Sequence, residues 1–342
     1  MFQIQNLKKY LPGILLIAVI LFALPENSWA ITQYSIKGDV SVEAVPENPI
    51  PNSSVKFSVT DGSTEYENSI YQWTLDGKTI LKGLGQKSVT FATGRAGKVM
   101  QLSLELLTPR GELVQKKFSI NPASVSIVWE TDSYTPDFYD GKPLPTEGSN
   151  VRFIAVPEMY EPNGRKLTPS ELYFEWSHEF EKDSAMSGYN KDVYPYEFLN
   201  TLREDNFSVR VRNLDGSIVA DTATYLEAID PEMYFYEDSP LRGTIFSRAV
   251  SGEYNMGSRE ITLRAEPYFL PLDNKSRLVN GIFDWEIDGK LATPSSGDRS
   301  AITLRQDKAG SGSADLSAKV TTGTVDVSAN LTVNFSKGSV RF

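Results

Sequence analysis

Cysteine is absent from the 342 residues of this chain, and histidine occurs once, as His178. The first absence excludes disulfides, thiolate metal sites and thiol nucleophiles. The second excludes metal sites built from several imidazoles and leaves one candidate imidazole base. Neither a P-loop nor a Gly-x-Gly-x-x-Gly string is found, so the common sequence signals for binding nucleotide phosphates are missing as well.

A catalytic role has little support in the sequence. No Gly-x-Ser-x-Gly string is present to offer a serine nucleophile to His178. The 44 acidic residues must form some carboxylate pairs, yet no spacing marks one pair for acid–base work. We therefore expect a non-enzymatic protein without catalytic or cofactor-binding residues. We interpret His178 as a structural residue at a strand end, with a catalytic or pH-sensing role as the alternative.

The first 30 residues differ in composition from the rest. Two lysines precede an uncharged apolar run at 11–24, and small residues follow at Ser28 and Ala30. This order matches a secretory signal peptide. The run has 14 residues, fewer than the roughly 20 that a spanning helix prefers. We expect either cleavage after Ala30 or retention of the run as an N-terminal membrane anchor, and in both cases an exported protein of the cell envelope, cell surface or medium.

Acidic residues outnumber basic ones, which gives a formal net charge of −10. Such a surface disfavours nucleic acid and anionic lipid as partners. Some acids lie near the predicted domain junctions and offer oxygen ligands for calcium, although no EF-hand string is present. Solvated loop acids are the simpler interpretation. The residues concerned are Glu130, Asp132, Asp137, Asp140, Asp230, Glu232, Glu237 and Asp238.

An internal repeat is visible in the tryptophan residues. Three of them share one local frame, YQW, FEW and FDW, and lie 103 and 109 residues apart. Each of these three strings comes after a segment that alternates between apolar and polar residues. A second alternating segment follows about 30 residues later. Short strands bounded by Gly, Pro, Asn and Asp fill the remainder, and no extended helical periodicity occurs after residue 30. The spacing is the length of one small β-sandwich.

We therefore predict an all-β chain of three tandem Ig-like or PKD-like β-sandwiches behind the N-terminal signal or anchor segment. The predicted boundaries are 1–30 for that segment, 31–121 for module 1, 122–228 for module 2 and 229–342 for module 3. The linkers between them are short, which favours a semi-rigid rod.

The strings YQWTLDGK (71–78) and FDWEIDGK (283–290) are nearly the same. Alternation places the tryptophan with its apolar neighbours, so we predict Trp73, Trp176 and Trp285 as core anchors. The alternative is an exposed aromatic platform. Asp-Gly tolerates positive φ at two residues and predicts a type I′ hairpin turn. Module 2 is the exception, because FEWSHEF carries His178 in the aliphatic position and has no Asp-Gly, so we expect the turn to be lost there.

The string Trp-x-Leu/Ile-Asp-Gly-Lys in modules of about 100 residues resembles bacterial Ig-like and PKD-type repeats. The whole chain resembles exported proteins of candidate-phylum bacteria with tandem β-sandwiches. PKD repeats usually have Gly before Asp-Gly, where this chain has Leu75 and Ile287. The resemblance therefore favours the broader Ig-like assignment. It implies a surface or envelope protein, and its motifs carry no chemistry.

We predict a structural spacer or a protein-interaction module, adhesin-like or part of a surface assembly, that binds envelope or surface proteins by edge pairing of strands. The candidate contact residues are Tyr189, Tyr194 and Tyr196, within SGYNKDVYPYEF. The alternative is that these rings only pack a loop on the sandwich. A carbohydrate-binding surface protein, with glycans as partners, is the rival function.

Overall fold

The chain is described here by a computed structural model. Residues 1–30, which hold the predicted signal or anchor segment, lie outside the described part. Where the chain is described, no helix combines the length and the apolar character needed to cross a membrane. The described residues are 31–37, 40–60, 64–199, 204–272, 283–294, 297–306, 310–322 and 325–336.

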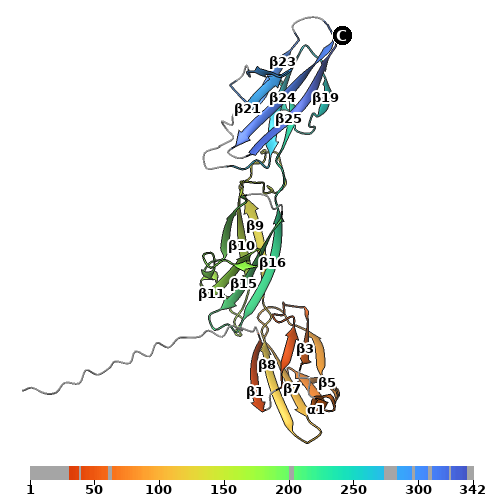
Figure 1. The fold of residues 1–342 in the computed structure, drawn as a ribbon, viewed down its shortest axis with the longest axis vertical. Coiled ribbons are helices and arrows are strands. Elements are labelled where there is room, and N and C mark those ends of the chain that lie inside the picture. The colour runs from red at the N-terminus through yellow and green to blue at the C-terminus, as the bar shows by residue number, and fades with distance from the viewer. Residues whose placement is uncertain are drawn as a thin grey trace, which may run out of the picture.

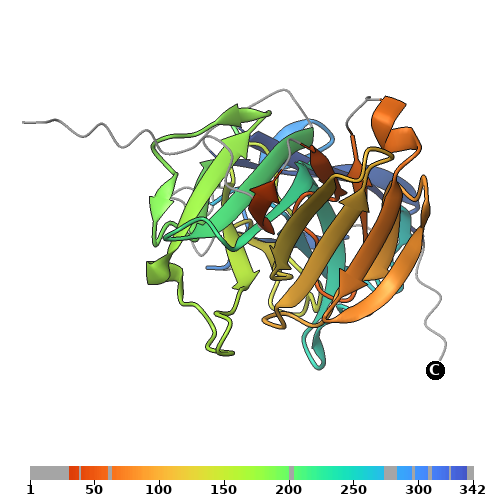
Figure 2. The same cartoon turned by 90° about the horizontal axis from the view of Figure 1, so that it is seen from below.

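Three β-sandwiches follow one another along the long axis of the molecule (Figure 1). The view from below shows module 1 displaced sideways from module 2 rather than aligned with it (Figure 2). In the described ranges, helix is limited to α1 (Thr64–Glu67) and the short 3₁₀ helix η1 (Pro169–Glu171). The prediction of an all-β chain is confirmed.

Module 1 packs a sheet of five strands on a sheet of three. The five-stranded sheet has the order β1 (Ile31–Lys37), β8 (Leu113–Ile120), β7 (Met100–Leu107), β4 (Ile70–Leu75) and β5 (Lys78–Leu84). The three-stranded sheet has the order β2 (Val42–Val45), β3 (Ser54–Val59) and β6 (Ser88–Ala92).

Module 2 repeats this plan. Its smaller sheet has the order β14 (Val193–Glu197), β10 (Asn150–Glu158) and β9 (Ser124–Thr131). Its larger sheet has the order β12 (Glu181–Lys182), β11 (Leu172–His178), β15 (Glu204–Asn213) and β16 (Val219–Glu227), with β13 (Gly188–Tyr189) also paired to β11.

Module 3 pairs sheets of four and five strands. The first has the order β18 (Gly243–Thr244), β17 (Glu232–Ser239), β20 (Glu260–Tyr268) and β23 (Ala301–Arg305). The second has the order β19 (Gly252–Asn255), β25 (Val325–Phe335), β24 (Gly312–Thr322), β21 (Phe283–Ile287) and β22 (Lys290–Ala292). β19 pairs with β25 in parallel.

Each module has its own hydrophobic cluster, with buried members within 40–120, 123–226 and 233–333. Alternation along the strands produces these cores, as β7 shows with buried residues at every second position. A tryptophan lies in each cluster, and Trp73, Trp176 and Trp285 are all buried. Truncating such a side chain to alanine typically costs about 3–5 kcal/mol of folding free energy.

Each of the three indole rings also makes an equivalent hydrogen bond to a backbone carbonyl. The Nε1–H of Trp73 donates to the carbonyl of Gln86 at 3.0 Å. The Nε1–H of Trp176 donates to Lys191 O, and that of Trp285 to Arg299 O, both at 2.8 Å. Each acceptor lies two residues before the first residue of a strand in the facing sheet, β6, β14 or β23. The tryptophan therefore joins the two sheets of every module as well as filling its core.

The Asp-Gly turns have the predicted conformation. Asp76 and Gly77 have φ values of 48° and 81°, and Leu75 pairs directly with Lys78. Asp288 and Gly289 repeat this geometry between β21 and β22, with φ values of 49° and 71°. Two positive φ values in a two-residue loop define the type I′ turn, so this prediction is confirmed.

Module 2 keeps the same turn, and the expectation that it is lost was wrong. His178 pairs directly with Glu181, and the two residues between them have φ values of 49° (Glu179) and 66° (Phe180). Side chains other than Gly, Asn and Asp rarely adopt this region, which costs about 1–2 kcal/mol per residue. The surrounding hairpin therefore imposes the turn against local preference.

The junction between modules 2 and 3 is aromatic. Phe138 stacks on Phe246 with ring centroids 3.8 Å apart, and its ring plane is nearly perpendicular to those of Tyr236 and Tyr268. The hydroxyls of Tyr236 and Tyr268 are 2.7 Å apart. Tyr134 forms an isolated β-bridge with Leu270, so the segment that follows β9 joins the next module by backbone hydrogen bonds as well.

The junction between modules 1 and 2 relies on small and polar groups. The three linker residues between β8 and β9 are buried, and Asn121 Nδ2 donates to Tyr160 O at 3.1 Å. Gly97 lies against Tyr160, where an added Cβ would come within 2.6 Å of the tyrosine Cβ. Asn48 Nδ2 donates to Asp221 Oδ1 at 2.7 Å at the other side of the junction.

Candidate binding surfaces

The three tyrosines predicted as contact residues do not form one surface in the structure. Tyr189 is about half exposed, and its ring meets the edge of Tyr173 at 5.3 Å with an interplanar angle of 85°. Tyr194 is buried in the core, where it packs against Trp176 and donates its hydroxyl to Asp183 Oδ2 at 2.9 Å. Burial and this carboxylate raise the pKa of Tyr194. The prediction that Tyr194 contacts a partner is therefore wrong.

Tyr196 points the same way as Tyr194 and is only partly exposed. Its hydroxyl donates to Asp205 Oδ2 at 2.7 Å, and burial together with this bond raises its pKa. Both rings face inward because Tyr194 and Tyr196 are two residues apart in β14 and therefore lie on the same face of the strand. Of the three predicted contact residues, only Tyr189 remains on the surface in an open position.

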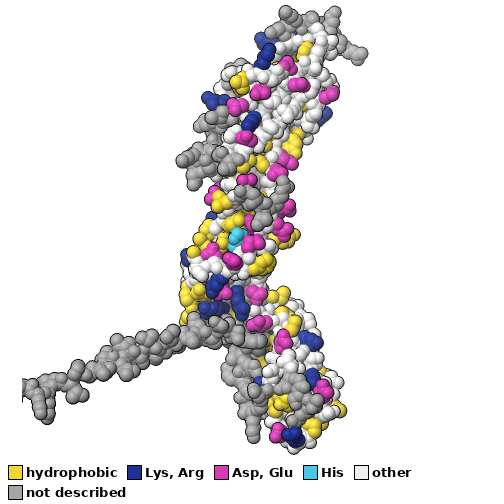
Figure 3. Space-filling model, viewed as in Figure 1, with side chains coloured by type: hydrophobic (Ala, Val, Ile, Leu, Met, Phe, Trp, Pro, Cys, Tyr) yellow, Lys and Arg dark blue, Asp and Glu magenta, His cyan; other side chains and the backbone are white. Residues whose placement is uncertain are grey.

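His178 lies at the end of β11, as the sequence predicted, and its ring faces the core. It stacks on Phe207 with centroids 4.8 Å apart and an interplanar angle of 18°, and it also contacts Tyr196 at 4.9 Å. Its Nε2 is 3.7 Å from Asp205 Oδ1. One edge of the ring reaches the surface, where Figure 3 shows the single histidine of the chain near acidic side chains.

Several of the acids considered for calcium have protein partners. Both oxygens of Asp132 accept hydrogen bonds from Asn150, at 2.8 Å each. Glu130 pairs with Arg152, and Glu237 accepts the hydroxyl of Tyr254 at 3.0 Å. Within the described residues, none of the predicted acids belongs to a group of three or more ligand side chains.

An exposed aliphatic row crosses module 1 at the end that faces away from module 2. It was not predicted from the sequence. Ile70 of β4 pairs with Leu84 of β5 and with Leu107 of β7, which in turn pairs with Leu113 of β8. Their exposed fractions are 43%, 65%, 42% and 50%. Four outward-facing aliphatic side chains in one register form a contiguous patch, which we call the aliphatic row.

The next register position along the same face is polar. Gln72 Nε2 donates to Glu105 at 3.4 Å, and Gln115 Nε2 donates to the other oxygen of Glu105 at 2.9 Å. The aliphatic row is therefore bordered by a hydrogen-bonded polar row. An apolar patch with a polar rim is the usual composition of a protein-contact surface.

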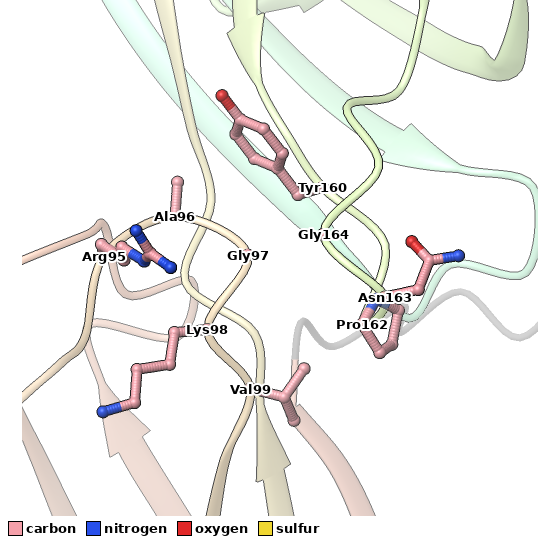
Figure 4. A pocket seen from close by; sticks show the side chains of 9 residues that line it. All are labelled: Arg95, Ala96, Gly97, Lys98, Val99, Tyr160, Pro162, Asn163 and Gly164. Carbon is pink, nitrogen blue, oxygen red and sulfur yellow. The ribbon is translucent and has the colours of Figure 1, made fainter.

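A cleft of about 720 Å³ opens between modules 1 and 2 (Figure 4). Module 1 contributes the loop with Arg95 and Lys98, and module 2 contributes Tyr160 and the turn at Asn163. A second cleft of about 410 Å³ lies between the β2–β3 loop and β15. Both clefts belong to the same junction, so this junction is less closely packed than the aromatic one.

No family model matches the chain, and no curated protein matches it. Among solved structures, it is similar to three N-terminal domains of the outer capsid protein Hoc of bacteriophage RB49, with 12% identity over 87% of this chain and 98% of that chain and a TM-score of 0.27. It is also similar to the central fibronectin-III array of RIM-binding protein, with 12% identity over 87% and 95% and a TM-score of 0.28.

A third likeness is to the Bacteroides ovatus protein SGBP-B of a mixed-linkage glucan utilization locus, determined with a heptasaccharide. It has 14% identity over 89% of this chain and 70% of that chain, with a TM-score of 0.18. These three likenesses concern the fold alone. At such identities and TM-scores they carry no argument about a ligand or a partner.

Proposed function

We propose that this chain is an exported, non-enzymatic spacer of the cell envelope or cell surface that binds a protein partner through module 1. The observation that carries the proposal is the placement of the aliphatic row at the free end of a row of three sandwiches. Module 1 is joined to module 2 by a three-residue buried linker. A short buried linker limits how far the modules can separate, as a spacer requires.

The binding role rests on the aliphatic row. Isolated exposed aliphatic side chains are ordinary, but four of them side by side on four neighbouring strands are not. Among the described strands, β5 at the sheet edge pairs on one side only, which supports the predicted edge pairing of a partner strand. We assign the contact to this region of module 1 in place of the tyrosines of module 2.

Glycan binding is the second candidate, and the exposed Tyr189 is the observation in its favour. The rings of Tyr173 and Tyr189 are nearly perpendicular, so together they do not make the flat platform on which a sugar ring stacks. The aliphatic composition of the row also fits a protein better than a sugar. Binding on a glycan array that is lost in Tyr189→Ala, with the row intact, would favour the second candidate.

The absence of cysteine allows a direct test of export. We expect Leu291→Cys, at an exposed position of β22, to react with a membrane-impermeant maleimide on intact cells. Leu316→Cys, buried in the same module, is the matched control and should react only after denaturation. Labelling of the Leu291→Cys variant only after cell lysis would contradict export.

The partner contact is tested by a double substitution in the row. We expect Leu107→Ser with Leu113→Ser to abolish cross-linking to envelope proteins. The free energy of unfolding should change by less than about 1 kcal/mol, because both side chains are already exposed. Leu291→Ser, with an equally polar change in module 3, should leave cross-linking intact. If the double variant cross-links as strongly as Leu291→Ser, the aliphatic row is not the contact surface.

A further inference from the structure

The three tryptophan hairpins correspond residue by residue, and module 2 differs from the others at the end of its core. Two residues after the tryptophan, modules 1 and 3 have Leu75 and Ile287, whereas module 2 has His178. The register between the strands makes Met100 and Ala314 the counterparts of Asp205. Module 2 therefore places two ionisable side chains where its siblings place apolar ones.

The first turn residue is an acid in all three modules and has a common structural role. Asp76 Oδ1 accepts from the amide of Gln101 at 2.7 Å, and Asp288 Oδ1 accepts from the amide of Asp315 at 2.9 Å. In module 2, Glu179 Oε1 accepts from the amide of Asn206 at 2.6 Å. The longer Glu side chain keeps this bond while its carboxylate lies beside His178 and Asp205.

The polar end of the module 2 core is incompletely satisfied. The side chain of Asp205 is only 7% exposed, and one of its oxygens accepts the hydroxyl of Tyr196. His178 Nε2 is buried and has no hydrogen-bond partner within the described residues. Leaving such an atom without a partner costs about 1–3 kcal/mol. Modules 1 and 3 avoid this cost with apolar residues, so the polar set in module 2 points to a ligand.

We propose that His178, Glu179 and Asp205 bind a divalent transition-metal ion, with Zn²⁺ as the best fit. One ligand atom from each side chain lies within 4.8 Å of the others. The His178 Nε2 and Asp205 Oδ1 atoms are 3.7 Å apart. Ligand atoms about 2.0–2.1 Å from a tetrahedral Zn²⁺ lie about 3.3–3.4 Å from each other, so this pair needs little movement.

The donor set also selects among metals. Two carboxylates balance the charge of a divalent cation when the imidazole is neutral. Ca²⁺ and Mg²⁺ prefer oxygen ligands throughout, whereas an imidazole nitrogen suits Zn²⁺ and its neighbours in the first transition row. Three protein ligands would leave one tetrahedral position for water or an added ligand. This inference stands independently of the function proposed above.

Binding would join the end of β11, the strained turn and the start of β15 through one ion. We expect the untagged full chain, in which His178 is the only imidazole, to bind one Zn²⁺ per chain by isothermal titration calorimetry. Saturating Zn²⁺ should raise the melting temperature of module 2 by about 10 °C. His178→Gln and Asp205→Asn should each weaken binding about 10-fold or more.

Glu181→Gln is the matched control, because Glu181 is an exposed acid in the same hairpin. Its affinity for Zn²⁺ should equal that of the wild type. Pulsed EPR of the Cu²⁺-loaded chain gives a readout that does not depend on stability. We expect the electron spin echo of the bound Cu²⁺ to be modulated by the nitrogen of one imidazole.

The proposal is overturned by any of three results. They are no saturable binding in the micromolar range, equal binding by His178→Gln, or a Cu²⁺ spectrum without imidazole modulation.

Discussion

Module 3 meets module 2 through a cluster of aromatic rings, whereas module 2 meets module 1 through a glycine, a few amides and an ion pair. The first junction has Phe138 between rings of the next module and a β-bridge at Tyr134. The second leaves two clefts of about 720 and 410 Å³. Close aromatic packing fixes an orientation, and a loosely packed polar contact permits adjustment. We therefore expect the molecule to bend between modules 1 and 2.

The largest effect is expected at the aromatic junction. Tyr268→Ala removes a buried ring that contacts Phe138, Tyr139 and Tyr236, so we expect a loss of about 3 kcal/mol in the unfolding of module 3. Small-angle X-ray scattering should also show a wider range of shapes. Tyr268→Phe, which removes only the hydroxyl, is the control and should cost about 1 kcal/mol. Equal losses for the two variants would mean that ring packing does not hold this junction.

Gly97→Ala should act on the other junction. The new Cβ would lie 2.6 Å from Tyr160 Cβ, and the φ of +75° disfavours alanine. Gly111→Ala, at φ +81° with open space around it, isolates the conformational cost. We expect about 1 kcal/mol for Gly111→Ala and about 2 kcal/mol for Gly97→Ala. Only Gly97→Ala should change the distance between spin labels on modules 1 and 2. An unchanged distance would contradict the close contact at Tyr160.

A pH-dependent effect is expected at the aromatic junction. Burial raises the pKa of Glu266 above its ordinary 4.5, although Arg264 partly offsets this. The native state then holds the proton more tightly than the unfolded state, so this stability is present below pH 4.5 and is lost as pH rises through the folded pKa. Glu266→Gln should be more stable than the wild type at pH 7, with the difference shrinking toward pH 4.5 in urea unfolding.

The exposed acid Asp284 provides the comparison for that experiment. Asp284→Asn removes one negative charge at an exposed position and is the matched control for the effect of net charge. A Glu266→Gln difference that is constant with pH would contradict the role of burial at this carboxyl.

The smallest effect is expected for the ion pair of the polar junction. Arg210 and Glu47 are 3.8 Å apart, and both side chains are more than a third exposed. Exposed pairs contribute about 0–1 kcal/mol, so Glu47→Gln should change the free energy of unfolding by less than about 0.5 kcal/mol. The angle between modules should also be insensitive to salt. A strong salt dependence in scattering experiments would mean that charge pairs, rather than neutral contacts, hold this junction.

Much of the fold could be predicted because its signals are local. Trp73, Trp176 and Trp285 stand in alternating frames, and period-two alternation directly specifies which face of a strand is buried. The Asp-Gly pairs specify a type I′ turn because few other residues adopt two successive positive φ values. Glu179 and Phe180 gave no such signal. Their turn is imposed by the pairing of β11 with β12, which is not a local property of those two residues.

The candidate surfaces were harder to predict, for two physical reasons. Tyr194 was assigned to a loop, although Tyr194, Tyr196 and Phe198 recur at the spacing of a strand. Pro195 obscured this signal, yet proline is acceptable in β14 because β14 is an edge strand. The aliphatic row depends on which residues of four strands lie side by side. Register across distant strands is not readable from one sequence, so the row and the His178–Asp205 contact both required the structure.

The register of β1 has a mechanical consequence. Ile31 at its start pairs with Ile120 at the end of β8, so the chain enters and leaves module 1 at the same pole. Tension between Ile31 and module 3 would separate these two antiparallel strands one hydrogen bond at a time. In module 2, the chain enters at the start of β9 and leaves at the end of β16, at opposite poles. The same tension there loads many hydrogen bonds together in shear. Under load, module 1 should therefore yield first and serve as the extensible element of the molecule.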